Sequence, residues 1–227
     1  MTVPFHVARM FATLDLMTNG RAAWNIVTSL NDTEAHNMGR ESVIEHDARY
    51  DRADEFLEVV LGHWDTWADD ALIVDKASGR FADGSKVHRL DHKGANFSSR
   101  GPFTVPRSNQ GHPVLIQAGQ SGRGKRFAAE WGEMIFTYTP TVEVGRHEYA
   151  DLKAQCAATG RDPASMLIGA LVHPVVAETK MEAEDKRAAL DKLPLEVDSL
   201  MLLSEALNFD FGSKPLDEPL TDADIAS

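Results

Sequence analysis

The chain has 227 residues, 43% of them hydrophobic, so it can bury a sizeable core as one large domain or two small ones. Its 35 acidic residues outnumber its 23 Lys and Arg residues; a net charge of −12 argues against nucleic acid as a partner, although a local basic patch can hold one phosphate. The single cysteine suits a reducing compartment, and the sequence does not open with a signal-like segment, so we predict a cytoplasmic protein. The apolar runs are too short to cross a bilayer, so we predict no membrane span.

The first half of the chain contains two predicted helices and one predicted strand. The first helix covers 3–17, because a proline suits its first turn and apolar residues recur every three or four positions. A short strand follows over 22–28, and the longest helix covers 45–67 with a clear apolar stripe. The stretch 69–111 is rich in Gly, Ser, Pro and charge. We predict an irregular excursion there, in which 103–105 alternates like part of a small hairpin.

Strands and helices then alternate along the second half of the chain. Strands are predicted over 113–118, 134–138 and 166–176, and helices over 124–133, 144–159 and 178–193. This alternation is typical of parallel β–α units in an α/β protein. With the strand at 22–28 the count is four, whereas a closed (β/α)8 barrel needs eight strands and about 250 residues. We therefore predict an open sheet or part of a barrel, in one domain over 1–207, followed by an acidic, loosely ordered tail over 208–227.

A glycine-rich loop over 118–126 leads from the second predicted strand into a helix. Such a turn exposes backbone N–H groups where the helix dipole favours an anion. The hydroxyl of Ser121 and the charge of Arg123 or Lys125 would add to phosphate binding, although a tight turn that simply needs its glycines explains the same pattern. Two sharper motifs fail here. A P-loop needs Ser or Thr where Arg126 stands, and a nucleophile elbow needs glycine at position 123.

Other polar side chains lie at the ends of predicted elements. His46 and Tyr50 are four residues apart and share one face at the start of the long helix, on the side of a β–α fold where ligands bind. They are equally explained as amphipathic rings with their polar tips in water. Asn25 ends the first strand, where it meets a ligand or belongs to a turn. His88 and His92 have metal-ligand spacing, but no helical pattern or acidic cluster accompanies them, so we predict no metal.

Eight stretches of the chain together carry a family resemblance. They are 4–9, 13–15, 20–29, 46–50, 54–56, 100–102, 113–121 and 160–163. In this order they resemble flavin-dependent monooxygenases of the bacterial-luciferase superfamily, in the branch that includes nitrilotriacetate monooxygenase. The match spans about 4–193, and the combination is much more specific than any single motif.

The resemblance implies a luciferase-like (β/α)8 barrel of the TIM-barrel type, incomplete here with about four to five β–α units. It implies an enzyme that uses reduced FMN, supplied by a separate NAD(P)H:flavin reductase, and O₂ to oxygenate a small organic substrate, with the flavin carrying the oxygen chemistry. Carried over by position, His46, Tyr50 and Ser121 match residues that hold FMN at its phosphate and ribityl end. Gly119 and Gln120 belong to the same loop. Asn25 matches a strand-end asparagine beside the flavin.

Length separates this chain from the family that it resembles. Family members carry further strands before the region of Pro4 and a further segment beyond Leu207. The resemblance therefore implies a truncated product, a broken gene or one half of a split protein, for which we expect a homo-oligomer or a complementing chain as partner. The alternative function is a truncated non-catalytic remnant or interaction module of that family. A P-loop nucleotide hydrolase is disfavoured by Arg126. We expect a sheet that does not close, and hydroxyls of Tyr50 and Ser121 about 4–8 Å apart on one face. Asn25 should open onto that face, deeper towards the sheet.

Overall fold

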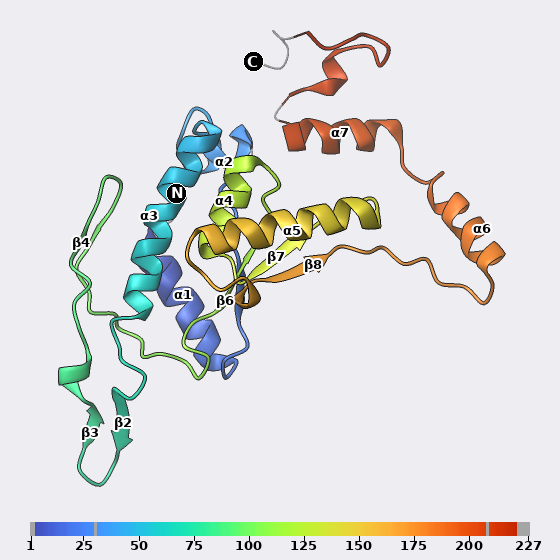
Figure 1. Cartoon of the computed structure of the whole chain (residues 1–227). Helices are drawn as coiled ribbons and strands as arrows, with labels where there is room; N and C mark the ends of the chain where they lie inside the picture. Colours follow the sequence, from blue (N-terminus) through green and yellow to red (C-terminus); the bar gives the residue numbers. More distant parts are fainter. Residues whose placement is uncertain (1–2, 30, 208, 222–227) are drawn as a thin grey trace. The chain divides into compact units, whose positions relative to one another are not determined.

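The computed structural model describes residues 3–29, 31–207 and 209–221, and Figure 1 labels its elements. The chain divides into two units: one takes in Met1–Thr28 and Glu45–Leu171, and the other takes in Ser29–Ile44 and Val172–Ser227. All the predicted site residues belong to the first unit. The proposed start of a tail at 208 stays a prediction, and residues 208 and 222–227 lie outside the described residues.

A parallel sheet of four strands forms the centre of the first unit (Figure 1). In sheet order the strands are β1 (Ala23–Asn25), β6 (Val114–Gln117), β7 (Met134–Thr137) and β8 (Leu167–Ala170). All four predicted strands are confirmed, and the sheet is open, as the strand count predicted. The last strand is shorter than the predicted 166–176: its pairing with β7 ends with the 2.7 Å hydrogen bond from the Leu171 N–H to Thr137 O, and the second unit begins at the next residue.

Four helices of the first unit pack on one face of this sheet. They are α1 (Pro4–Met17), α3 (His46–Trp64), α4 (Gly122–Trp131) and α5 (Val142–Ala158). Side chains cap the starts of three of them. Glu45 accepts the Ala48 N–H on α3, Ser121 accepts the Gly124 N–H on α4, and Thr141 accepts the Val144 N–H on α5. The Trp64 indole N–H bonds the Ala8 carbonyl at 3.0 Å and fixes α1 against α3.

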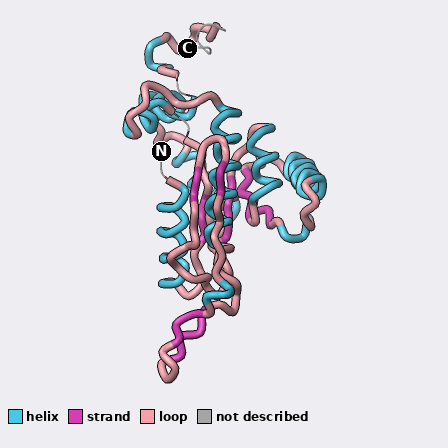
Figure 2. The backbone as a smooth tube through the Cα atoms, turned by 90° about the vertical axis from the view of Figure 1, so that its left-hand side faces the viewer, coloured by secondary structure: helices cyan, strands magenta, loops and turns pink. Residues whose placement is uncertain are grey.

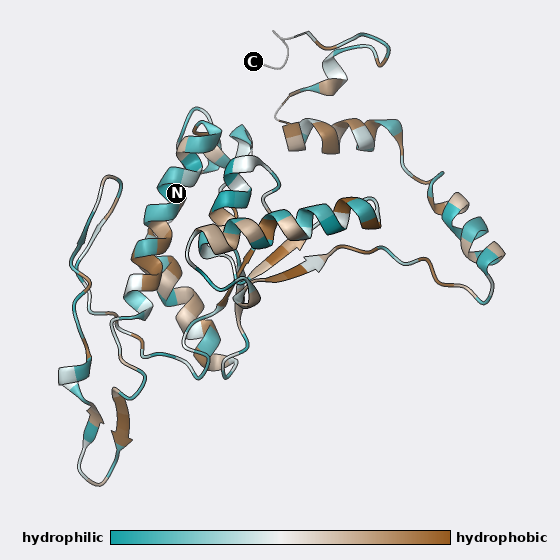
Figure 3. Cartoon of the chain, viewed as in Figure 1, coloured by the Kyte–Doolittle hydropathy of each residue, from teal (hydrophilic) through white to brown (hydrophobic). Residues whose placement is uncertain are grey.

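The two faces of the sheet differ in burial. Leu115 and Ile135 point towards the helices and are 2% and 1% exposed. On the other face Ile116, Met134 and Leu167 are register neighbours, because paired residues of adjacent strands point the same way. Leu167 is 64% exposed and Phe136, on the same face as Met134, is 40% exposed; Figure 3 shows hydrophobic colouring along these strands. Within the described residues, this apolar face is open.

The excursion between α3 and β6 contains two small antiparallel hairpins (Figure 2). One pairs β2 (Leu72–Asp75) with β3 (Arg80–Ala82), and the other pairs β4 (His92–Lys93) with β5 (Ser98–Ser99). The hairpin predicted around 103–105 is wrong. Phe103 is buried against Phe5 and His63, and its backbone bonds the side chains of Thr66 and Trp67. The alternation there reflects a loop that packs into the core.

In its described residues, the second unit contains three α-helices and one 3-10 helix, η3 (Phe211–Ser213). The α-helices are α2 (Asp32–Asn37), α6 (Lys180–Leu190) and α7 (Glu196–Leu207). Helix α6 was predicted and starts with a capping box between Thr179 and Glu182, whereas α2 and α7 are additional to the predicted elements. Among the described helices, none combines the length and the apolar character that crossing a bilayer requires.

Candidate functional site

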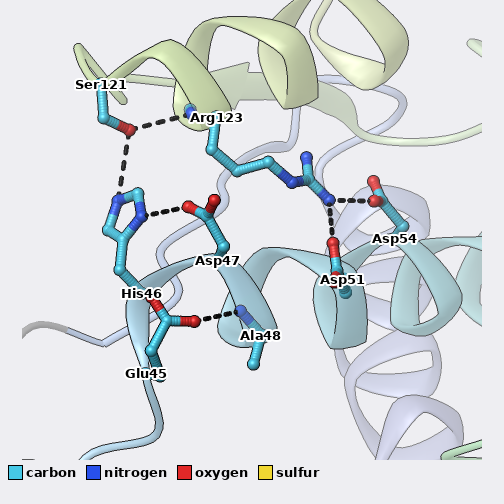
Figure 4. A network of polar contacts seen from close by, with 9 residues as sticks. Glu45, His46, Asp47, Ala48, Asp51, Asp54, Ser121 and Arg123 are labelled. Carbon is cyan, nitrogen blue, oxygen red and sulfur yellow. Dashed lines mark hydrogen bonds and ion pairs between the residues drawn. The ribbon is translucent and has the colours of Figure 1, made fainter.

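His46 and Ser121 meet at the carboxyl-terminal edge of the sheet (Figure 4). His46 is the first residue of α3, and Ser121 caps α4 at the end of the loop that follows β6. The His46 Nε2 and Ser121 Oγ atoms lie 3.2 Å apart, although 75 positions separate the residues. Ser121 Oγ also accepts the Gly124 N–H at 2.9 Å. The loop and the helix start therefore form one cluster, as the β–α architecture predicted.

Tyr50 brings a third polar group to this cluster. Its side chain is 6% exposed, and its ring centroid lies 5.1 Å from that of His46 in an edge-on contact. An ideal Cβ added at Gly119 would lie 2.7 Å from the Tyr50 hydroxyl, and one at Gly124 would lie 2.9 Å from that hydroxyl and 3.0 Å from Ser121 Oγ. Both glycines are thus required by close packing, and the two hydroxyls border one small space on one face. The predicted proximity of Tyr50 and Ser121 is confirmed.

The Tyr50 hydroxyl is left without a partner. In the part of the chain that the structure describes, no hydrogen bond engages it, although the rest of the ring is packed against His46 and Phe127. A hydroxyl that has no hydrogen bond within the protein is available to donate to an incoming acceptor. An oxygen-rich ligand at the α4 start would satisfy it, because the N–H groups of the first turn of a helix also point there.

The two cations expected to assist this loop are turned away from it. The Arg123 guanidinium lies 5.4 Å from the centroid of the Tyr50 ring and pairs with Asp51, at 2.9 Å, and with Asp54. Burial disfavours the charged guanidinium, but the hydrogen bonds to the two carboxylates outweigh burial and raise the pKa of Arg123. Lys125 pairs with Glu148 at 2.5 Å. The expectation that Arg123 or Lys125 offers charge to an anion here is wrong, because carboxylates of α3 and α5 hold both.

The remaining predicted site residues lie near the cluster in different roles. The Gly119 N–H donates to the Gln117 side chain, and Gln120 Nε2 donates to Ala118 O and Phe136 O at 3.2 and 3.3 Å. Gln120 therefore ties the loop to the end of β7. Asn25 ends β1 in register with Ile116, on the sheet face opposite to the helices. The structure brings His46, Tyr50 and Ser121 together and places Asn25 at the same sheet edge but outside their contacts.

Two other candidate groups have structural partners. His92 Nε2 lies 3.2 Å from Glu55 Oε1, and the described residues contain no group of three or more His, Cys, Asp or Glu side chains with metal-site geometry. Cys156 is buried, with Sγ 3.8 Å from Asp162 O. The acidic partners of the site, namely Asp47, Asp51 and Asp54, were not predicted from the sequence. They belong to α3, and a position on a helix does not say which basic groups a carboxylate meets.

Comparison with known proteins identifies the family. Residues 2–214 match the family model described as "Luciferase-like monooxygenase". The dibenzothiophene-sulfone monooxygenase of Rhodococcus erythropolis is 49% identical over 96% of this chain and 48% of its own length. Nitrilotriacetate monooxygenase component A of Aminobacter aminovorans is 43% identical over 96% of this chain and 48% of its own length. The chain thus spans about half the length of these curated relatives.

Solved structures match in the same way. The crystal structure of a long-chain alkane monooxygenase superposes with a TM-score of 0.89 at 33% identity, covering 99% of this chain and 52% of that one. A riboflavin lyase, crystallised "with modified FMN and substrate Riboflavin", gives a TM-score of 0.89 at 35% identity and covers 100% of this chain and 52% of that one. By sequence and by fold, the chain belongs to the luciferase-like monooxygenase family and corresponds to about half of its longer members.

Proposed function

We propose that this chain is part of an FMN-dependent monooxygenase and that His46, Tyr50 and Ser121 hold the phosphate end of the cofactor. The observation that carries the proposal is the hydroxyl of the largely buried Tyr50 side chain, which lacks a hydrogen bond in the described residues and lies near Ser121 Oγ beside Gly124. A phosphate ester supplies acceptor oxygens of the kind that this donor lacks. Two relatives whose names state monooxygenase activity support the reaction class.

Each residue of the cluster has a distinct part in this proposal. The hydroxyls of Tyr50 and Ser121 donate to phosphate oxygens, while the free N–H groups and the dipole at the start of α4 favour the negative charge. Gly119 keeps the loop free of a Cβ that would collide with the Tyr50 hydroxyl. Asn25, at the same sheet edge, lies where the rest of the cofactor extends over the sheet. When bound, reduced FMN supplies the oxygen chemistry, and the protein binds it, orients it and excludes water.

The proposed reaction is oxygenation of a small organic molecule with O₂, with reduced FMN delivered by a separate NAD(P)H:flavin reductase. The relatives' names specify different substrates, among them dibenzothiophene sulfone, N-acetyl-S-(2-succino)cysteine and nitrilotriacetate. A small organic substrate is therefore the class that we propose. Because the chain spans about half of these relatives, we also propose that a complementing half is needed for turnover.

Titration with FMN and riboflavin tests the phosphate site. We expect Tyr50→Phe and Ser121→Ala each to weaken FMN binding by about 1–3 kcal/mol, because each removes a charge-assisted hydrogen bond. Riboflavin lacks the phosphate and should respond much less. Two controls match the changes: Tyr149→Phe alters an exposed tyrosine, and Thr141→Ala removes the cap of α5 without touching the cluster. Equal losses for FMN and riboflavin would show that Tyr50 and Ser121 do not bind the phosphate.

A second candidate function is a non-catalytic interaction module of the same family. The observation in its favour is the open sheet, whose apolar face leaves Leu167 64% and Phe136 40% exposed. Such a surface favours association with another polypeptide. The two candidates differ in one measurement. Saturable FMN binding in the presence of the half that this chain lacks supports the oxygenase, and association without FMN binding supports the interaction module.

A further inference from the structure

The His46 imidazole lies between a carboxylate and a hydroxyl (Figure 4). Its Nδ1 atom is 2.7 Å from Asp47 Oδ1, and its Nε2 atom is 3.2 Å from Ser121 Oγ. An ionised carboxylate only accepts hydrogen bonds, so the proton of the neutral imidazole belongs on Nδ1. The lone pair of Nε2 then accepts the Ser121 O–H, while Ser121 Oγ accepts the Gly124 N–H. In the free protein, the single hydroxyl proton of Ser121 is therefore directed at His46.

The other charged groups around His46 do not replace Asp47 in this arrangement. Glu45, on the same helix, accepts the Ala48 N–H, and that backbone bond lowers the pKa of its carboxyl group. Arg123, from α4, is held by Asp51 and Asp54. The Tyr50 ring meets His46 edge-on. Asp47 is thus the group with a direct bond to the imidazole, and the 42% exposed His46 side chain can exchange protons with solvent.

We propose that Asp47 is a positioning residue which makes binding of a phosphate monoester take up one proton at His46 Nε2. This rests on the proposed function, in which Ser121 donates to the phosphate of FMN. To donate there, Ser121 must release its bond to His46. A proton taken from solvent onto Nε2 removes that acceptor, adds a second N–H donor and places an imidazolium beside the dianion. Asp47 stabilises the imidazolium through Nδ1; the bond that forms is Nε2–H, and the solvent or buffer acid that supplies the proton loses its own bond to it.

Calorimetric FMN titrations in buffers of different ionisation enthalpy measure the proton uptake. The titrations are made at about pH 8, above the second phosphate pKa near 6. We expect net proton uptake by the wild-type chain, and almost none by His46→Gln. Asp47→Asn should take up clearly less than the wild type and bind FMN about two- to fivefold more weakly, a range set by the exposure of this ion pair. Glu58→Gln, which removes an exposed acid from the same helix, should match the wild type.

The imidazole tautomer gives a readout that needs no ligand. In nitrogen NMR spectra of the wild-type chain at the same pH, we expect His46 with its proton on Nδ1, and a shift towards the Nε2–H form in Asp47→Asn. A wild-type Nε2–H tautomer overturns the inference whatever FMN does. FMN binding without proton uptake also overturns it but leaves the proposed function standing. Failure to bind FMN with the missing half of the fold supplied overturns the proposed function, and the tautomer still decides the role of Asp47.

Discussion

Glu55 on α3 is the most heavily engaged carboxylate of the first unit outside the candidate site. It accepts the Phe97 N–H and both the backbone and side-chain N–H groups of Asn96 at 2.7 Å, and it lies 3.2 Å from His92 Nε2. Burial raises the pKa of this carboxyl, but the hydrogen bonds from Asn96, His92 and Phe97 outweigh burial and lower it from 4.5 to about 2. Glu55 therefore fastens the β4–β5 hairpin to α3 in its ionised form.

This pKa shift predicts how stability depends on pH. The folded pKa of Glu55 is below the unfolded value, so its contribution is complete above about pH 4.5 and is lost as the pH falls towards 2. We expect Glu55→Gln to lower the free energy of unfolding by about 1–3 kcal/mol at neutral pH and to flatten its decline in acid. Urea unfolding from pH 7 to pH 3 measures both effects. The exposed neighbour in Glu58→Gln serves as the control, and parallel pH curves for Glu55→Gln and wild type would contradict the prediction.

A single carboxylate of α3, that of Asp54, bonds to both ends of α4. Asp54 accepts hydrogen bonds from Arg123 in the first turn of α4 and from the Trp131 indole N–H, at 2.7 Å, in its last residue. The Arg123 side chain is 12% exposed, so this pairing offsets the cost of burying its charge. Because Ser121 caps the same helix, Asp54 also fixes the distance between Ser121 and His46.

We expect Asp54→Asn to destabilise the first unit by about 1–3 kcal/mol, because a mostly buried guanidinium loses a charged partner. Asp51→Asn is the matched control. Asp51 binds the same Arg123 nitrogen at 2.9 Å but is 73% exposed, so its loss should cost little. Denaturant unfolding with hydrogen exchange across α4 provides the measurement. Equal effects of the two substitutions would mean that Asp54 does not hold the helix.

At the scale of the whole molecule, the open sheet is the dominant feature. The strands β1 and β8 lie at its two edges, and Leu167 and Phe136 extend its exposed apolar face. Unpaired strand edges and an apolar sheet face both favour a further layer or further strands. The chain superposes on 52% of the long-chain alkane monooxygenase structure, and we predict that a further segment of comparable size covers this face.

This arrangement predicts that a charge on the exposed face of the sheet changes stability little, whereas a charge on the buried face prevents folding. Leu167→Lys should change the stability of the chain alone by less than about 0.5 kcal/mol, because the side chain is already exposed, whereas Ile135→Lys buries a charge and should prevent folding. The wild-type chain should co-purify with the segment of the Rhodococcus erythropolis relative that has no counterpart here, when the two are co-expressed. Leu167→Lys should abolish that association. If Leu167→Lys unfolds the chain alone, the face is already covered.

The sequence by itself determined the four strands of the sheet, the four helices that pack on it, and the family. Periodicity alone locates the four strands and α1, α3, α4 and α5, because burial of one face imposes a local repeat that requires no knowledge of partners. The glycine-rich loop that contains Gly119 and Gly124 is also recognisable in the sequence. The structure explains why glycine stands at these two positions, because a Cβ there would collide with the Tyr50 hydroxyl. The order of eight motifs indicated the family that the comparisons show.

Only the tertiary structure decided which polar groups meet. The pairing of His46 with Ser121, and of Arg123 and Lys125 with acids of α3 and α5, depends on how helices pack across positions far apart in the chain. The same dependence explains why 103–105 was mistaken for a hairpin, since Phe103 fills a core position set by α1 and α3. The sequence does not say which acids a basic residue of the glycine-rich loop meets, and only packing decides it. Local patterns therefore gave the elements, and packing assembled the site.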